Sequence, residues 1–136
     1  MDFLEFNRNL IAEFRANNGE VTGQFAGSPL LLLTTTGAKF GLSRTSPLVY
    51  SKDGENVVII ASKGGAPSHP AWYLNLLANK SAMLEMGPQT FAVSASIAEG
   101  DERRRLFDQQ AALMPNFKEY EAATSREIPV VVLTRV

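Results

Sequence analysis

Two cationic side chains lie in a glycine-rich stretch that follows an apolar run. Lys39 stands between Gly37 and Gly41, and Arg44 follows shortly after the second glycine. Glycine lets the backbone approach a bound group closely, while lysine and arginine neutralise negative charge and donate hydrogen bonds to it. Thr36, at the end of the apolar run, adds a hydroxyl donor. The stretch therefore predicts an anion-binding loop.

A second stretch, farther along the chain, repeats this combination. Ser62 and Lys63 can donate hydrogen bonds, Gly64 and Gly65 leave room for a ligand, and a helix containing Trp72 is expected to follow. Neither stretch is a Walker motif or a dinucleotide fingerprint, because the Gly/Lys spacing differs from both. The residues alone predict an anion-binding groove with an aromatic neighbour.

The composition excludes several other kinds of site. The chain of 136 residues has no cysteine, which excludes disulfides, thiolate catalysis and Cys-ligated zinc. Its one histidine, His69, has no second histidine or acidic cluster to complete a metal site, so we predict no metal. A net charge of −1 gives no steering toward nucleic acid. Redox chemistry would require a bound cofactor.

The apolar runs and the N-terminal residues indicate where in the cell the protein is expected. No apolar run approaches the roughly 20 residues that a membrane-spanning helix requires. The first residues do not resemble a secretory signal, so we expect a cytoplasmic protein. Residues 1–18 place apolar side chains at helical spacing, which predicts an amphipathic helix that covers the barrel or pocket. Weak peripheral membrane contact stays open for this helix, although Asp2, Glu5 and Glu13 oppose binding to anionic lipid.

The remaining pattern predicts a small antiparallel barrel. Asp53-Gly54 is a hairpin turn signal between the second and third strands, and Pro47 in the second strand requires an edge or a bulge. Helices are expected over 68–79 and 99–114, with a short turn up to Tyr120. The expected strands are 30–36, 44–51, 56–62, 82–86, 90–98 and 128–136. Without βαβ alternation, this order indicates an α+β fold: a single domain over 1–136 with six mostly antiparallel strands flanked by helices.

Four segments together carry a family resemblance. They are LLLLTTTGAKFGLSRTSPL, VVIIASKGGAPSHPAWYLNL, the helix WYLNLLANK and the ending TSREIPVVVLTRV. Over residues 25–136 the chain resembles the deazaflavin (F420)-dependent nitroreductase family of the flavin/deazaflavin split β-barrel superfamily. The resemblance implies a split β-barrel and coenzyme F420 as the cofactor, with FMN less favoured.

The resemblance also implies roles for particular residues. Trp72 and the region of Tyr120 would border the deazaflavin ring and the substrate, and Tyr120 or Tyr73 would donate a proton to the reduced acceptor. Family members commonly carry an arginine where this chain has Ala38 and an aromatic where it has Val49, which affects the acceptor more than the cofactor class. The implied cofactor-binding residues are Thr36, Lys39, Arg44, Pro47, Ser62, Lys63, Gly64, Gly65 and Trp72.

The implied activity is transfer of a hydride from reduced F420 to an apolar acceptor such as a nitroaromatic, a quinone or an enone. The protein would then be an F420-dependent oxidoreductase of the nitroreductase or quinone reductase type. Two alternatives stay open at this point. One is an FMN-binding split-barrel oxidoreductase, and the other is a non-catalytic cofactor carrier, suggested by the absence of an obvious acid/base pair. Split barrels commonly dimerise, so a homodimer also stays open.

Overall fold

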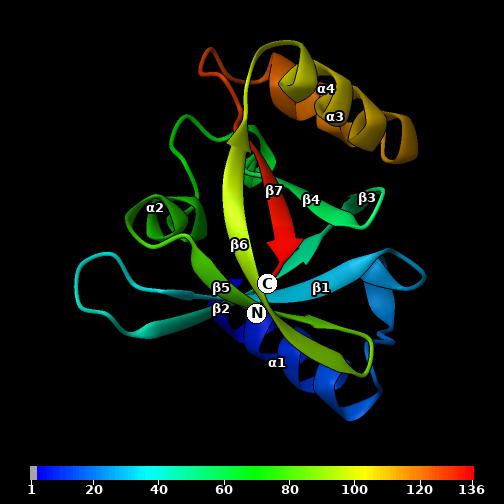
Figure 1. Cartoon of the computed structure of the whole chain (residues 1–136). Coiled ribbons are helices and arrows are strands. Elements are labelled where there is room, and N and C mark those ends of the chain that lie inside the picture. The colour runs from blue at the N-terminus through cyan, green and yellow to red at the C-terminus, as the bar shows by residue number, and fades with distance from the viewer. Residues whose placement is uncertain (1–2) are drawn as a thin grey trace.

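The computed structural model describes residues 3–136 and shows a curled antiparallel sheet with helices on its outside (Figure 1). The α+β class is confirmed. The helices are α1 (Phe3–Ala16), α2 (Ala71–Ala78), α3 (Gly100–Leu113) and α4 (Asn116–Ala122), with 3₁₀ turns η1 (Gly23–Phe25) and η2 (Lys63–Gly65). The strands are β1 (Leu30–Thr36), β2 (Ser43–Val49), β3 (Ser51–Asp53), β4 (Asn56–Ile60), β5 (Ser81–Met86), β6 (Gln89–Ala98) and β7 (Val130–Arg135).

The strand order explains why the sheet curls into a barrel. The order is β2-β1-β5-β6-β7-β4-β3, so β2 and β3 are the two outermost strands. The same two strands are neighbours in the chain, separated by Tyr50 alone. A flat sheet would hold its two edges far apart, whereas one connecting residue requires them to meet. The chain connection therefore bends the sheet back on itself.

The expected number of strands was wrong by one. We predicted six strands, with residues 44–51 forming one of them, but this segment is divided between β2 and β3. The β2 part pairs with β1, and the β3 part pairs with β4 across the predicted Asp53-Gly54 turn. The alternation of side chains does not reveal the division, because the backbone stays extended through the corner. Pro47 lies in β2, at the edge of the sheet, as predicted.

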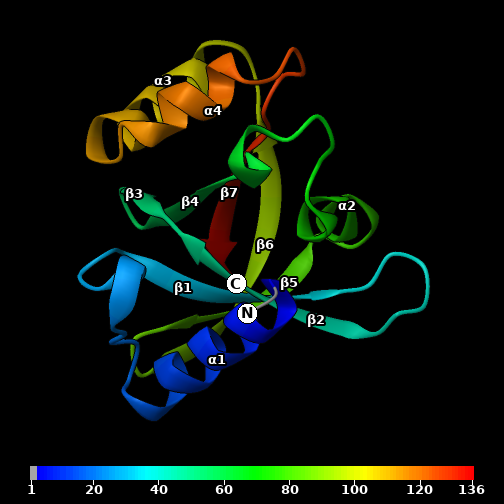
Figure 2. The ribbon, with the colours of Figure 1, turned by 180° about the vertical axis from the view of Figure 1, so that it is seen from behind.

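The apolar run at the start of β1 is buried on both faces. Leu31 and Leu33 point into the barrel core, while Leu30 and Leu32 pack against Leu10 and other apolar residues of α1. Strand side chains alternate between faces, so this run contributes to two separate clusters. Figure 2, which views the molecule from behind, shows α1 running beneath the strands. The N-terminal helix is therefore an outer cover of β1.

The other helices cover the remaining faces. Leu106 and Phe107 of α3 and Phe117 of α4 form a cluster with the outer side chains of β4 and β7, at the top of Figure 1. Helix α2 places Trp72 and Leu76 in the barrel core, beside β1 and β4. None of the helices within residues 3–136 is long and apolar enough to span a membrane. One side of the barrel, between α1, α2 and α4, is hollowed by a groove.

Candidate functional site

A groove of about 1200 Å³ occupies this side of the barrel. Its walls come from α1, η1, the loop 37–42, β2, the end of β4 with the loop 62–64, α2 and α4. Residues far apart in the sequence therefore line the same groove. Residues 3–136 contain no group of three or more His, Asp or Glu side chains that could hold a metal ion.

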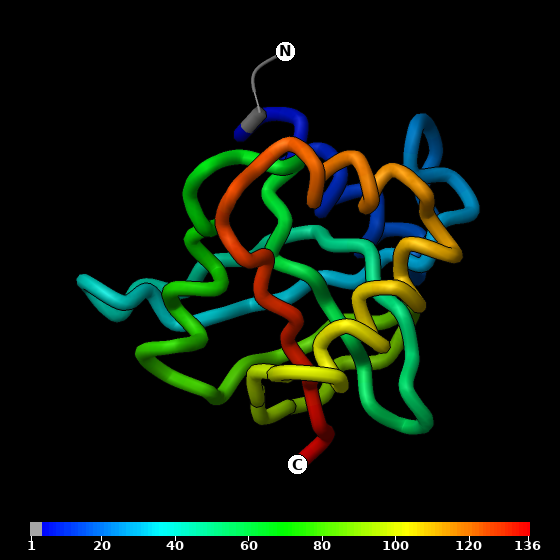
Figure 3. The backbone as a smooth tube through the Cα atoms, turned by 90° about the horizontal axis from the view of Figure 1, so that it is seen from above, coloured from blue at the N-terminus to red at the C-terminus, as the bar shows by residue number. Residues whose placement is uncertain are grey.

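The first predicted anion loop, residues 37–42, connects β1 to β2 and projects from the body of the molecule (Figure 3). Its base is closed by the Gly37 amide, which donates to the Leu42 carbonyl at 2.7 Å. Lys39 lies exposed on the loop, and Arg44 is exposed at the start of β2. Both line the groove, and their binding of an anion stays a prediction.

A buried amide on α2 fixes this loop, and the sequence analysis did not identify it. Asn75 is 7% exposed; its Oδ1 accepts from the Ala38 amide at 3.0 Å, and its Nδ2 donates to Thr35 Oγ1 at 3.1 Å. A buried amide needs partners, and the loop supplies one of them. The signal in the sequence is one polar residue among the apolar residues of AWYLNLLA.

The second predicted anion loop has an unusual backbone. Lys63, Gly64 and Gly65 have φ angles of 47°, 63° and 84°, so three consecutive residues adopt the left-handed region. A lysine there is uncommon, and such conformations persist only where the surroundings enforce them. Lys63 is exposed toward the groove, and its Nζ donates to Ser68 Oγ at 3.3 Å.

The two glycines of this loop have different roles. Gly64 lines the groove, and no atom lies within 4 Å of the position that a Cβ would take there. A Cβ on Gly65 would lie 2.9 Å from the Ala123 Cβ and 2.9 Å from the Tyr120 carbonyl oxygen. Gly65 does not line the groove. Instead it allows the loop to pack directly against α4.

The aromatic residues divide between the groove and the core. Trp72 lines the groove although it is only 6% exposed, and its ring meets that of Tyr73 edge-on at 6.5 Å. Tyr73 is buried in the barrel core and stacks against His69 at 4.9 Å. Tyr120 of α4 lines the groove, and its phenol oxygen accepts from Asn116 Nδ2 at 2.7 Å.

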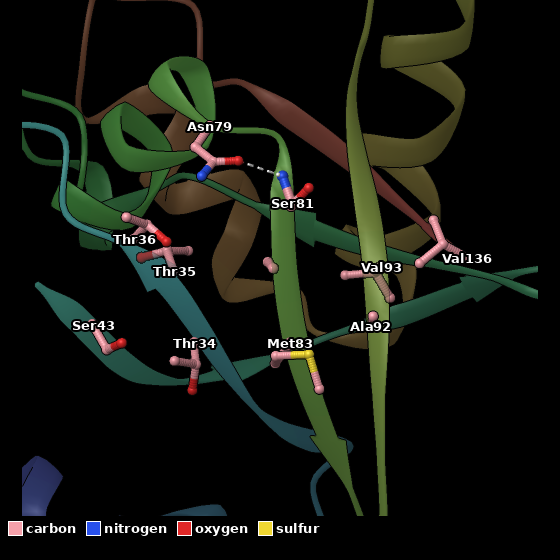
Figure 4. Close-up of a pocket in the computed structure, with 11 residues that line it drawn as sticks. Thr34, Thr35, Thr36, Ser43, Asn79, Ser81, Met83, Ala92, Val93 and Val136 are labelled. Atoms are coloured by element: carbon pink, nitrogen blue, oxygen red, sulfur yellow. Dashed lines mark hydrogen bonds between the residues drawn. The ribbon is translucent and has the colours of Figure 1, made fainter. Parts of the chain in front are cut away.

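The structure brings most of the predicted site residues together and separates three. Tyr73 lies in the core, and Gly65 lies under α4. Thr36 lines a second, smaller hollow of about 280 Å³ between β1, β5 and β6, shown in Figure 4. The predicted residues that line the groove are Lys39, Arg44, Pro47, Ser62, Lys63, Gly64, Trp72 and Tyr120.

The three lysine and arginine side chains at the groove are not neutralised. Within residues 3–136 the ion pairs involve other arginines and Lys118, and none includes Lys39, Arg44 or Lys63. Arg44 makes only a long contact from Nη1 to the Ser43 carbonyl, at 3.4 Å. Three exposed cations beside an apolar groove fit a ligand with an anionic part and a planar apolar part. The fold is that of a split-barrel protein, and the charges around its groove suit an anionic organic coenzyme.

Comparison with known proteins identifies the family. The model of the F420H(2)-dependent quinone reductase family matches residues 6–135. An F420H(2)-dependent quinone reductase of Mycobacterium tuberculosis (strain ATCC 25618 / H37Rv) is 42% identical over 128 residues, covering 91% of this chain and 86% of that protein. The chain therefore belongs to the F420H(2)-dependent quinone reductase family, and the predicted kinship with F420-dependent split barrels is confirmed.

Solved structures support the same fold. The structure of an F420-H2 dependent reductase (FDR-A) is 36% identical, covers 78% of this chain and 94% of its own, and gives a TM-score of 0.72. A second structure, described as a domain-swapped dimer, is 32% identical over 98% of both chains with a TM-score of 0.74. The heme storage protein HutZ of Vibrio cholerae, at 17% identity and a TM-score of 0.61, shares the fold alone. The predicted split-barrel class is confirmed.

Proposed function

We propose that this protein binds reduced coenzyme F420 in the groove and transfers a hydride from it to a quinone. Membership of the family supports both the F420 cofactor and the oxidoreductase class. The observation that carries the proposal is the groove itself, about 1200 Å³ in volume, with an apolar interior and three cations that form no ion pair within residues 3–136. A planar apolar ring with an anionic extension matches that distribution of charge.

The cations indicate where the anionic part of the coenzyme lies. Lys39 and Arg44 approach from the first loop, and Lys63 approaches from the second. Hydrogen bonds to phosphate or carboxylate are stronger when the donor is charged, and arginine can bind such groups with two parallel bonds. The phosphate and the acidic tail of the coenzyme would therefore lie between the two loops.

The apolar walls leave room for the ring and the acceptor. Trp72 from α2 and Pro47 from β2 offer flat apolar surfaces at the groove, beside the cations. Phe6 of α1 and Phe25 of η1 line it on the side of the N-terminal helix, with ring centroids 6.3 Å apart. An apolar acceptor such as a quinone gains free energy from burial against such side chains. We therefore place the acceptor toward α1.

Bound reduced F420 would supply the hydride, and the chain would align the reactants and manage a proton. Reduction of a quinone to a hydroquinone needs one hydride and one proton, while the coenzyme becomes oxidised. The Tyr120 oxygen already accepts a hydrogen bond from Asn116, so its own hydrogen is available to another acceptor. Tyr120 is thus suited to donate the proton, which water then restores.

Fluorescence titration with F420, with FMN as competitor, tests the cofactor. We expect preferential binding of F420, followed by oxidation of the reduced coenzyme by quinones. Tighter binding of FMN would contradict the proposal and favour the FMN-dependent alternative. Binding of F420 without oxidation by any quinone, nitroaromatic or enone would instead favour a cofactor carrier.

Two tyrosine variants test the proton donor. Tyr120→Phe should lower kcat for quinone reduction by at least about tenfold, because positioned acid catalysis typically contributes 10²–10⁴-fold. Its affinity for F420 should stay the same. Tyr73→Phe removes the hydroxyl of the other predicted donor, which the structure places in the core. A larger loss of kcat in Tyr73→Phe than in Tyr120→Phe would reverse the assignment.

Assembly and location complete the proposal. The relative described as a domain-swapped dimer supports a homodimer, which light scattering on the purified protein would measure directly. A monomer at micromolar concentration would contradict it. Because the reduced coenzyme must be regenerated by another enzyme in the same compartment, a cytoplasmic location stays part of the proposal.

A further inference from the structure

Arg126 lies outside the groove, in the segment between α4 and β7, and binds the loop that carries Lys63 from behind. Its Nη2 donates to the carbonyls of Ala61 at 3.2 Å and Ser62 at 2.9 Å, and its Nε donates to the carbonyl of Ala66 at 2.9 Å. One guanidinium thus connects the two ends of the loop 61–66. The planar fork of arginine suits this arrangement, because several fixed donors can serve several acceptors at once.

The remaining nitrogen of Arg126 reaches the segment before α2. Its Nη1 lies 3.0 Å from His69 Nδ1. Arginine has no acceptor, so it donates and the histidine ring accepts at Nδ1. His69 in turn stacks on Tyr73, which adjoins Trp72 in α2. Arg126 therefore ties the Lys63 loop to the helix that carries the aromatic wall of the groove.

None of the four partners of Arg126 is a carboxylate. Among the ion pairs within residues 3–136, Arg103 pairs with Glu127 and Arg105 with Asp53, but Arg126 takes part in none. Burial lowers the pKa of the Arg126 guanidinium below its usual value, yet an arginine stays charged at neutral pH. A positive charge that no carboxylate cancels therefore lies directly behind Lys63.

The contacts of Arg126 also determine where the backbone donors of the loop point. A trans peptide holds its carbonyl and the following N–H on opposite sides, and residues 3–136 contain no cis bond. The carbonyls of Ala61 and Ser62 point to Arg126, so the N–H groups of Ser62 and Lys63 point away from it. Successive backbone N–H groups turned to one side form a concave anion site.

We propose that Arg126 is a positioning residue for the coenzyme: by holding the carbonyl side of the loop 61–66, it presents the backbone donors and the Lys63 side chain to the anionic part of F420. The inference rests on the proposed function. It adds a residue that does not touch the groove, and it explains why Lys63 adopts a left-handed conformation, since Arg126 and α4 hold the loop on both sides.

The test measures three properties of Arg126→Gln and Arg126→Lys: the Kd for F420, the KM for the quinone menadione, and the melting temperature. Arg126→Gln should raise the Kd at least about tenfold, the scale for losing hydrogen bonds from a charged group. The KM for menadione should stay within about twofold, because the acceptor lies on the α1 side. Arg126→Lys should fall between the wild type and Arg126→Gln, since an ammonium has charge but only three donors.

Arg103→Gln is the matched control. Arg103 also donates twice to a backbone carbonyl, that of Ile128, at 3.0 and 2.8 Å, but it lies on α3 away from the groove. We expect a lower melting temperature and an unchanged Kd for F420. A Kd raised as much in Arg103→Gln as in Arg126→Gln would show a merely structural role and overturn the inference.

Other results are equally decisive. A folded Arg126→Gln with an unchanged Kd overturns the inference while leaving the proposed function intact. If Arg126→Gln does not fold, Arg126→Lys decides: a Kd raised about threefold or more supports the positioning role, and a wild-type Kd overturns it. Failure of the wild-type protein to bind F420, measured first, overturns the proposed function and this inference with it.

Discussion

The two cationic loops of the groove are held in different ways. The loop 37–42 projects from the end of a hairpin (Figure 3), closed at its base by its own backbone and fixed by one side-chain contact from Asn75. The loop 61–66 is held from behind by Arg126 and lies against α4 at Gly65. One loop is anchored at a single point, and the other is held on both sides.

This difference predicts a division of roles. Ordering a mobile segment on binding opposes affinity, whereas a preorganised segment binds without that loss. The loop 61–66 should therefore supply most of the affinity for the anionic part of the coenzyme. The loop 37–42, with exposed Lys39, should act more in attracting the coenzyme and closing over it.

The largest effect is expected where the Lys63 loop meets α4. Gly65→Ala places a Cβ 2.9 Å from backbone and side-chain atoms of α4 at a φ of 84°, and overpacking together with left-handed strain should destabilise the protein by about 2 to 5 kcal/mol. Gly64→Ala is the control. Its φ of 63° imposes similar left-handed strain, but no atom lies within 4 Å of the new Cβ, so this variant measures the strain without the overpacking. Equal free energies of unfolding for the two variants, measured in denaturant, would contradict the close approach to α4.

The next effect concerns the single side-chain anchor of the other loop. Asn75→Ala removes both hydrogen bonds of a buried amide, and we expect a loss of about 1 to 3 kcal/mol in stability with weaker F420 binding. Asn79→Ala is the control, because Asn79 is exposed and its side-chain oxygen accepts from the nearby Ser81 amide, at 3.1 Å. An unchanged hydrogen-exchange rate at the Ala38 amide in Asn75→Ala would show that the loop does not depend on this anchor.

Charge removal compares the two loops directly. Lys39→Ala, Arg44→Ala and Lys63→Ala should each weaken F420 binding by about 1 to 3 kcal/mol, with Lys63→Ala at the upper end because its loop is already ordered. All three effects should shrink at high ionic strength. F420 titrations of the three variants at two salt concentrations measure both the loss of affinity and its dependence on ionic strength. Equal losses for Lys39→Ala and Lys63→Ala would remove the division of roles, and no loss in any variant would remove the anion site.

The smallest effect is a dependence on pH at the base of α4. Asp108 accepts from Lys118 at 2.8 Å, and this hydrogen bond, aided by the charge of Arg104, lowers the pKa of the carboxyl. A lowered pKa in the folded state means that the stabilisation is complete above the ordinary pKa of about 4 and is lost as pH falls through the lowered value. The free energy of unfolding, measured in denaturant, should fall slightly more between pH 7 and pH 3 for the wild type than for Asp108→Asn. Identical losses would exclude this contribution.

Local signals in the sequence predicted much of what these loops are made of. Gly37, Gly41 and Gly64 mark backbone turns, and the lysines beside them indicate anion binding without reference to the rest of the chain. The same reasoning could not separate Gly65 from Gly64, because both are glycines in one turn and only the approach of α4 distinguishes them. Arg126 and Asn75 were missed for the same reason, since their partners lie far away in the sequence.

The secondary-structure elements that could be predicted from the sequence are those that depend on neighbouring residues. The helical spacing in residues 1–18, the Asp53-Gly54 hairpin and the strand expected at 30–36 follow from side-chain period and turn chemistry. They appear as α1 (Phe3–Ala16), the β3–β4 hairpin and β1, while residues 1–2 of the expected helix lie outside the described part of the chain. The three-dimensional arrangement alone shows that the two loops share one groove, that Trp72 belongs to the core and also lines this groove whereas Tyr73 does not line it, and that Thr36 lines a different hollow. The physical reason is sheet closure: joining β2 to β3 through one residue sets long-range positions that no local pattern encodes.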